Sequence, residues 1–478
     1  MDSEQTRFEV ACEESHYDMV RLLLADNRVD PTDLNNNAIR LACEQGHVDI
    51  VRLLLADRRV NPTVMNDVII RRACLNGHVG VVQLLLADSR VDPANKYNLA
   101  VGWACKNGHV DVVRLLLADD RVNPADGRNS AIRSACQYGH VDVVRLLLTD
   151  DRVNPADNNN AAIRLACKNG HVDVVHLLLA DDRVDLADFD NKAIRSACKN
   201  GHVDVVRLLL ADDRVNPADY DNEAIKLACI GGHVDVVRLL LADGRINPAV
   251  DHNFAIREAC CCGYVDVVRL LLADSRVDPA DYGNEAIRWA SIEGHVDVVR
   301  LLLADSRVNP ADNNNRAIIS ASLGGHTNVV RLLLGDGRIN PADEDNRAMY
   351  WACKYGHDNV ICLLLMDHRI DIHHVISTCP KIVNEYSRKE TIRALLALGG
   401  IEPFCDGQLD PNVYSLDKLH YWQSTRYLNL YRRNEELKNG PYGVLLKDRL
   451  EVANLYGSIV LTRRLPLEMT ELVLGYMR

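Results

Sequence analysis

The chain has 478 residues and a net charge of −12 at pH 7, and none of its apolar runs approaches the roughly 20 residues that a membrane-spanning helix needs. Residues 1–372 hold 41 Lys and Arg against 55 Asp and Glu, a net charge of −14, and such an acidic surface repels phosphate backbones. The first residues show no secretory signal, so we expect a protein of the cytoplasm, with the nucleus as an alternative, that binds neither membranes nor nucleic acid.

The first predicted elements belong to a repeat of 31 residues that fills residues 1–372. Histidine recurs on this grid with Tyr264 as the single exception, and proline recurs with Leu186 and Ile372 in two of its places. The grid consists of His16, His47, His78, His109, His140, His171, His202, His233, His295, His326 and His357, and of Pro31, Pro62, Pro93, Pro124, Pro155, Pro217, Pro248, Pro279, Pro310, Pro341 and Pro403. We therefore divide the chain into twelve repeats over 1–372, a degenerate thirteenth at 373–403, and a tail at 404–478.

Each repeat predicts two short helices and an extended loop, and we number its positions 1 to 31 from the residue after the proline. Asparagine at position 5, as at Asn160, Asn191 and Asn222, is predicted to cap the first helix. Apolar residues at positions 7, 8, 11 and 12 form one face of that helix, and glycine at position 15, such as Gly170, ends it. "VDVVRLLLAD" predicts the second helix, with Asp and Arg three residues apart pairing on its exposed side, and "RVNPAD" predicts the loop.

Helix pairs this short cannot bury an apolar face alone, so each repeat is expected to stack on its neighbours in an all-α solenoid. "GHVDVVRLLL" after a short "A-hydrophobic-x-x-A-small" helix resembles the ankyrin repeat, over about four-fifths of the chain. The length of 31 residues and "AIR" in place of P-L-H depart from the usual pattern. Short 31-residue units that end in "RVNPAD" are similar to those of ankyrin proteins of protists and large DNA viruses. The resemblance implies loop fingers and a concave surface that binds partner proteins.

The recurring cysteines and histidines suggest metal or disulfide chemistry, but their spacing argues against it. Equivalent atoms of stacked repeats lie roughly 8–10 Å apart, whereas a disulfide needs Cα atoms within about 7 Å. We expect buried thiols and histidines that hydrogen-bond neighbouring repeats, with no metal and no cofactor; Cys261 and Cys262 fall at variable positions and are candidates for exposure. Ten cysteines occupy position 12, namely Cys12, Cys43, Cys74, Cys105, Cys136, Cys167, Cys198, Cys229, Cys260 and Cys353. No catalytic motif occurs, so we predict no enzyme.

Positions 3, 4, 6, 10, 13 and 14 vary between repeats while most others stay constant. Positions 3 and 4 are predicted at the loop tip, and the other four form a stripe on the first helix, away from its buried face. Aromatic residues concentrate there and are our candidate binding residues: Tyr97, Trp103, Tyr138, Phe189, Tyr220, Phe254, Tyr282, Trp289, Trp351 and Tyr355. The alternatives are a surface that tolerates any side chain, with position 10 half-buried, or an array that serves only as a spacer.

The tail at 404–478 is predicted to be helical, with breaks at Gly440-Pro441 and Pro466. "LPLEMTELVLGYM" resembles the opening of an F-box, and truncated F-box-like ends follow ankyrin arrays in poxvirus proteins with a PRANC tail; "LPL" is also similar to the end of a SOCS box. Either resemblance implies docking onto adaptor subunits of a cullin-type ubiquitin ligase. The residues that carry the match are Leu465, Pro466, Glu468, Leu472, Leu474 and Met477. The alternative is a cap over the last apolar face, with or without dimerisation.

Overall fold

The computed structural model describes residues 4–25, 29–186, 188–367 and 369–370. These residues form 24 helices and contain no strand, which confirms the predicted all-α class. The chain divides into an N-terminal part, residues 1–255, and a C-terminal part, residues 256–478, and we describe each by itself. None of the described helices is long and apolar enough to cross a membrane. The predicted thirteenth repeat and the tail lie outside the described residues.

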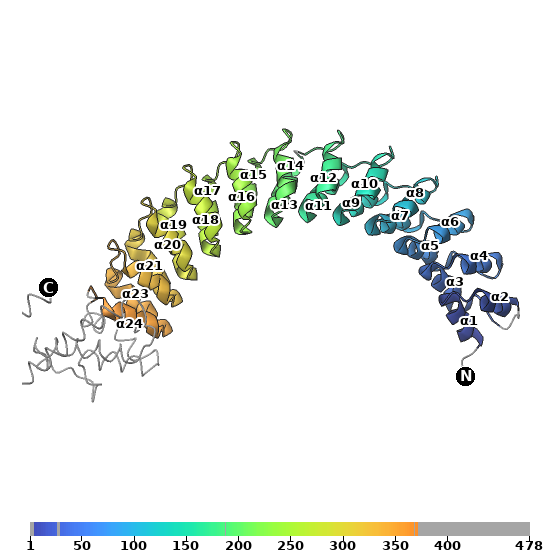
Figure 1. Ribbon diagram of the computed structural model, residues 1–478, viewed down its shortest axis with the longest axis horizontal. Helices are drawn as coiled ribbons and strands as arrows, with labels where there is room; N and C mark the ends of the chain where they lie inside the picture. Colours follow the sequence, from blue (N-terminus) through green and yellow to red (C-terminus); the bar gives the residue numbers. More distant parts are fainter. Residues whose placement is uncertain (1–3, 26–28, 187, 368, 371–478) are drawn as a thin grey trace, which may run out of the picture. The chain divides into compact units, whose positions relative to one another are not determined.

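Helices alternate along the chain, a first helix and a second helix in each repeat. In the N-terminal part the first helices are α1 Glu4–Glu13, α3 Asp33–Gln45, α5 Val64–Asn76, α7 Asn95–Asn107, α9 Asp126–Tyr138, α11 Asp157–Asn169, α13 Asp188–Asn200 and α15 Asp219–Ile230. The second helices are α2 Tyr17–Ala25, α4 Val48–Ala56, α6 Val79–Ala87, α8 Val110–Leu117, α10 Val141–Leu148, α12 Val172–Leu179, α14 Val203–Leu210 and α16 Val234–Ala242. Figure 1 shows the first helices from α3 to α13 on the inner side of the curved N-terminal part.

The C-terminal part continues the alternation. The division between the two parts falls within α17 Val250–Cys262. The helices that follow are α18 Val265–Ala273, α19 Asp281–Glu293, α20 Val296–Ala304, α21 Asp312–Gly324, α22 Thr327–Leu334, α23 Asp343–Tyr355 and α24 Asp358–Met366.

One face of the first helix in each repeat packs against the neighbouring repeats. In α9 the residues at positions 7, 8, 11 and 12, which are Ala131, Ile132, Ala135 and Cys136, are all buried, as their equivalents are in α7 and α11. Alanine and cysteine are small enough for adjacent first helices to pack closely, and α7, α9, α11 and α13 each pack against the next. The opposite face of these helices is therefore left to solvent.

The start of the first helix differs from the prediction, because asparagine at position 5 is not an N-cap. It is the last of three consecutive residues in the left-handed conformation: in α9, Gly127, Arg128 and Asn129 have φ angles of 61°, 59° and 55°. The amide of Asn129 donates to the carbonyl oxygen of Ala125 at 2.8 Å, which closes one left-handed turn. Left-handed backbone costs about 1–2 kcal/mol for each residue that has a side chain, so other contacts must hold the turn.

The asparagine side chain supplies two of those contacts. The Oδ1 atom of Asn129 accepts from the amide of Asn154, 25 residues later, at 2.8 Å. Its Nδ2 atom donates to Asp157 Oδ2 in the next repeat at 2.9 Å. The supposed caps behave alike: the Oδ1 atoms of Asn160, Asn191 and Asn222 accept from the amides of Asp185, Asn216 and Asn247, respectively. The asparagine side chain does accept from a backbone amide, as a cap would. That amide lies 25 residues later in the chain, whereas a capping rule considers only the first turn of the helix.

The histidine grid links consecutive repeats, as predicted. Nε2 of His171 lies 2.9 Å from the carbonyl oxygen of Gln137 in the preceding repeat, and Nε2 must donate because a carbonyl only accepts. The ring also lies against Gly139, whose φ is 78° and where an added Cβ would come within 2.5 Å of His171 Nδ1. Glycine at position 15 is therefore required for two reasons. It adopts the left-handed conformation at the helix end, and it leaves space for the imidazole of the next repeat.

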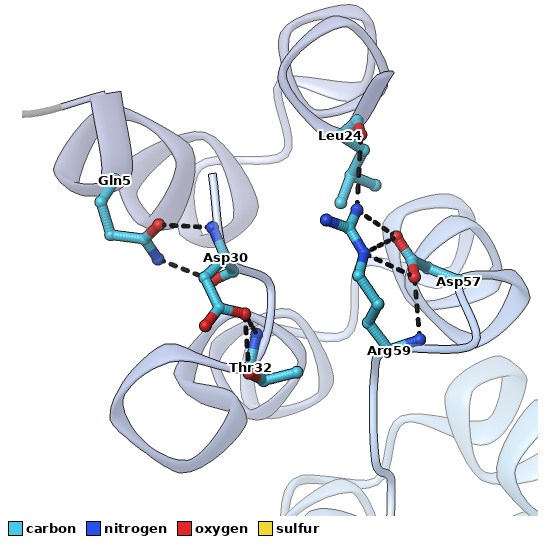
Figure 2. Close-up of polar contacts among 6 residues, drawn as sticks. All are labelled: Gln5, Leu24, Asp30, Thr32, Asp57 and Arg59. Atoms are coloured by element: carbon cyan, nitrogen blue, oxygen red, sulfur yellow. Dashed lines mark hydrogen bonds and ion pairs between the residues drawn. The ribbon is translucent and has the colours of Figure 1, made fainter. Parts of the chain in front are cut away.

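A further link uses Asp at position 26 and Arg at position 28. Figure 2 shows Arg59 bound to the carboxylate of Asp57, with Nη2 also 3.4 Å from the carbonyl oxygen of Leu24 in the preceding repeat. The equivalent Arg152 donates to the carbonyl oxygens of Leu117 and Val122 at 3.3 and 2.9 Å. The Asp thus orients an Arg that holds one or two backbone carbonyls of the repeat before it.

The first repeat makes the same kinds of contact with a different side chain. Gln5 stands at position 5, where most later repeats have asparagine, and Figure 2 shows it bound to the backbone amide and carbonyl of Asp30, both at 3.0 Å. On the second helices, the predicted pairs three residues apart are also present, as between Arg238 and Asp235 at 2.6 Å. Exposed pairs of this kind contribute at most about 1 kcal/mol, so the links between repeats matter more.

Candidate partner-binding surface

The variable positions 3, 4, 6, 10, 13 and 14 define a surface that we call the variable strip. Position 9 lies beneath the loop tip, because Arg133 donates to the carbonyl oxygens of Gly127 and Arg128 at 2.8 and 3.0 Å. Positions 9, 10, 13 and 14 follow on the same side of the first helix, opposite the buried positions 7, 8, 11 and 12. The loop tip and the exposed side of the first helix are therefore adjacent within a repeat.

The candidate aromatic residues with described side chains all reach solvent. Tyr97 at the loop tip is 81% exposed and Trp289 on the helix is 37% exposed, while Tyr138, Tyr220, Tyr282 and Tyr355 lie between these values. The side chains of Trp103, Phe254 and Trp351 are half-buried, and that of Phe189 lies outside the described residues. Tyrosines are thus the most accessible of the set, whereas Trp103 and Trp351 are partly covered.

Cations from the preceding repeat lie over several of these rings. The guanidinium carbon of Arg195 lies 4.7 Å from the ring centroid of Tyr220, and Lys106 Nζ lies 5.3 Å from that of Tyr138. Lys226 Nζ lies 5.9 Å from the ring of Phe254, and Arg257 lies 5.1 Å from that of Tyr282 in the C-terminal part. Such pairs orient an aromatic side chain and contribute roughly 0.5–1 kcal/mol at exposed sites.

These cations were not among the predicted site residues. Arg195, Lys226 and Arg257 occupy position 9, which is basic in most repeats and so was not counted among the variable positions. A signal was nevertheless present, because a cation at position 9 or 13 precedes an aromatic residue by 25 to 32 residues, close to one repeat length. Such a spacing has meaning only once the repeats are known to stack.

Aromatic residues gather most closely at the C-terminal end of α23. The rings of Trp351 and Tyr355 stack with centroids 5.8 Å apart, and Tyr350 meets Trp351 edge-on at 5.2 Å. Lys354 Nζ lies 4.7 Å from the ring centroid of Trp351 and within 6 Å of the other two. The structure therefore brings two predicted residues, Trp351 and Tyr355, into one aromatic cluster. Lys354 of the same helix already lies beside its rings.

The family follows from comparison with known proteins. The family model described as ankyrin repeats, in sets of three copies, matches residues 3–66, 70–162, 103–190, 164–253, 245–314 and 306–375. The chain belongs to the ankyrin repeat family. Ankyrin repeats are modules of protein–protein interaction, generally without catalytic activity, and the resemblance seen in the sequence is thereby confirmed. A comparison with curated proteins found no significant match.

Most of the recurring cysteines of the ankyrin array are buried, and burial disfavours their reactive thiolate form. Nine of the ten at position 12 are buried, as predicted, and Cys353 is half-buried. Burial raises the pKa of Cys12 to about 12, and it also raises the pKa of the others that are fully enclosed, such as Cys136. In the described residues no group of three or more His, Cys, Asp or Glu side chains is placed to hold a metal ion.

Cys261 and Cys262 stand apart, as predicted, because Cys262 is exposed and Cys261 half-buried. Desolvation, and after it the charge of Glu258, raises the pKa of both thiols. A raised pKa disfavours the reactive thiolate form. The predicted ligase-docking segment lies outside the described residues. Its residues are Leu465, Pro466, Glu468, Leu472, Leu474 and Met477.

Proposed function

We propose that this ankyrin array is a non-catalytic recognition module that binds a partner protein on the variable strip. The observation that carries the proposal is the coincidence of variation and aromatic content on a solvent-facing surface. Of the twelve aromatic residues in repeats two to twelve, ten fall at the six variable positions. Tyr and Trp are enriched among residues that dominate binding energy, whereas the packing positions here use Ala, Ile, Val and Leu.

The test replaces tryptophan and tyrosine on the strip. In the full chain, Trp103→Ala, Tyr138→Ala, Trp289→Ala and Trp351→Ala are combined, and the set of proteins that co-purify is quantified against wild type. We expect that set to be lost while the circular dichroism spectrum keeps its helical signal. The matched control combines Arg114→Ala, Arg145→Ala, Arg207→Ala and Arg300→Ala, which are exposed on second helices and should leave the set unchanged.

A second variant protects the test against misfolding, because two of the tryptophans are half-buried. It combines four substitutions of exposed tyrosines, Tyr97→Ala, Tyr138→Ala, Tyr220→Ala and Tyr282→Ala. Because these side chains are exposed, their removal should leave the packing of the repeats unchanged. Retention of the wild-type set of proteins by both variants would contradict the proposal and favour a spacer.

We further propose the cytoplasm, with the nucleus as an alternative, as the compartment. The argument is the large number of cysteines that stay free thiols in the described repeats, since oxidising compartments favour disulfides.

Docking to a cullin-type ubiquitin ligase through residues 465–478 is a second proposal. The support is the sequence "LPLEMTELVLGYM", whose Leu465, Pro466 and Glu468 match the opening of an F-box. The test is affinity capture from cells with the full chain and with residues 465–478 deleted. Cullin-adaptor subunits should be recovered with the full chain and lost with the deletion; their absence from both samples would leave the segment as a cap.

A further inference from the structure

Four successive repeats, residues 94–217, carry a concentration of positive charge on the exposed side of their first helices. At positions 3, 4, 6, 9, 10, 13 and 14 these repeats have Asp190 as their single carboxylate. The cations at the same positions, which we call the basic strip, are Lys96, Lys106, Arg128, Arg133, Arg164, Lys168, Lys192, Arg195 and Lys199. This concentration stands out because residues 1–372 as a whole have a net charge of −14.

The basic strip is continuous because its helices are neighbours. It lies on α7, α9, α11 and α13, which pack side by side within the N-terminal part and line the inner side of its curve (Figure 1). Lys106 reaches across to the next repeat, where its Nζ lies over the ring of Tyr138. Tyr97, Trp103 and Tyr138 belong to the first two of these four repeats, so aromatic and cationic side chains occur together at that end of the surface.

Two kinds of cation make up the basic strip. Arg133 and Arg164 are half-buried and donate to loop-tip carbonyls, Arg164 to that of Asn158 at 3.0 Å, so they hold the left-handed turns. The cations at position 13, namely Lys106, Lys168 and Lys199, are exposed, as Lys96 and Arg128 at the loop tips are. Arg133 and Arg164 therefore shape the surface, whereas the three lysines at position 13, Lys96 and Arg128 present charge to solvent.

The carboxylates nearest to the basic strip already have partners. Asp126 and Asp157, at position 2, accept hydrogen bonds from Asn98 and Asn129 of the preceding repeats. Among the described residues, Lys96, Lys106, Lys168 and Lys199 form no ion pair. By contrast, Arg207 on the second helix α14 lies beside Asp204 at 4.0 Å. The two carboxylates at position 2 are thus engaged in contacts between repeats, and Arg195 of the basic strip pairs with Glu223. The four lysines have no carboxylate partner in the part of the chain that the structure describes.

We propose that the basic strip binds an acidic protein segment in an extended conformation, lying across α7 to α13; this rests on the proposed function and names its partner class. Stacked helices are separated by roughly 8–10 Å, and an extended chain advances about 3.3 Å per residue. In the extended polyproline II conformation, with three residues per turn and about 3.1 Å per residue, every third side chain lies on the same side. A segment of about ten to twelve residues in that conformation, with a carboxylate at every third position, therefore matches the repeat spacing. Its apolar residues would meet Tyr97, Trp103 and Tyr138.

A protein segment fits this surface better than a nucleic acid. A nucleic acid strand carries a phosphate at every nucleotide, so its charge continues beyond any short patch. Past the four repeats it would meet an array that is acidic overall, and the repulsion would oppose binding. A short acidic segment confines its charge to the basic strip.

The test uses the full chain and a labelled twelve-residue peptide with Glu at every third position, in fluorescence anisotropy titrations. A peptide with Gln in place of Glu is the probe control. The variant combines Lys106→Glu, Lys168→Glu and Lys199→Glu; all three side chains are exposed, so folding should be retained and is checked by circular dichroism. The matched control reverses Arg114, Arg145 and Arg207 on the second helices, as R114E, R145E and R207E, which changes the net charge equally.

We expect wild type and the control variant to bind the Glu peptide, and the lysine variant to bind it at least about tenfold more weakly. Binding should weaken as NaCl rises from 50 to 300 mM, since exposed charges are screened, and the Gln peptide should not bind. Equal binding by all three proteins would overturn the proposal, and so would tighter binding of a single-stranded oligonucleotide than of the Glu peptide. If the peptide fails to bind but the tyrosine variant still loses its co-purifying proteins, only this partner class is wrong, not the strip.

Discussion

Asn129 combines a left-handed backbone with two hydrogen bonds that no other side chain of its size provides. Its φ is 55°, its Oδ1 accepts from the amide of Asn154 and its Nδ2 donates to Asp157. Alanine would keep neither bond and would be strained in this backbone, whereas glycine would lose the bonds but tolerate the backbone. The two substitutions therefore separate the conformational contribution from that of the hydrogen bonds.

We predict that Asn129→Ala destabilises the surrounding repeats by about 3 kcal/mol, and Asn129→Gly by about 1 kcal/mol less. The measurement is hydrogen–deuterium exchange of the Asn154 amide and its neighbours, because a stacked array opens locally. Both variants should expose that amide, and the alanine variant more so. Equal exchange in the two variants would mean that the left-handed turn carries no strain.

The end of the first helix depends on the repeat that follows it. Gly139 ends α9 at a φ of 78°, and the ring of His171 occupies the space that a Cβ would need. Gly102, within α7, is a natural comparison, since it has no positive φ and nothing lies within 4 Å of the position of an added Cβ. Glycines that look alike in a sequence thus differ in what surrounds them.

We expect Gly139→Ala to destabilise the array by about 2 kcal/mol or more, from strain and from the clash together. Gly102→Ala should stabilise it by about 0.5–1 kcal/mol, as alanine is the better helix former. Urea unfolding followed by circular dichroism measures both. In a His171→Ala background, which lacks the clash, Gly139→Ala should destabilise the array less than it does in wild type; the idea fails if Gly139→Ala unfolds at the wild-type urea concentration.

At the scale of the whole molecule, identical weak contacts recur along the array and add up. The hydrogen bond from Arg at position 28 lowers the pKa of Asp at position 26 in repeat after repeat, as for Asp57, Asp150 and Asp243. A pKa lowered on folding means that the unfolded chain binds protons more readily. This contribution to stability is present above the ordinary Asp pKa of about 3.9 and is lost as the pH falls through the lower folded value.

We therefore predict that the urea midpoint is nearly constant from pH 7 to 5 and falls steeply below about pH 4. Many carboxylates contribute to acid unfolding, so a variant with Asp119→Asn, Asp150→Asn and Asp181→Asn is needed. It should be less stable than wild type at pH 7, with a shallower loss between pH 4 and pH 3. Parallel curves for the two proteins would show that these pairs do not drive acid sensitivity.

The sequence by itself determined the repeat, the order of the two helices, the buried face and the residues that face solvent. These follow from periodicity, because a 31-residue grid and a helical spacing of apolar residues leave one stacking solution. The histidine contacts and the burial of cysteine at position 12 were predictable for the same reason: each is a consequence of stacking equal repeats.

Only the tertiary structure decided what lies across the boundary between repeats. The left-handed turn at Asn129 was interpreted as a helix cap because its side-chain partners, the Asn154 amide and Asp157 of the next repeat, are 25 and 28 residues away, beyond the reach of local rules. The basic strip was missed because Lys106, Lys168 and Lys199 are far apart in an acidic sequence. Periodicity determines which residues share a face within one repeat, whereas contacts and charge density along that face arise only when neighbouring repeats pack together.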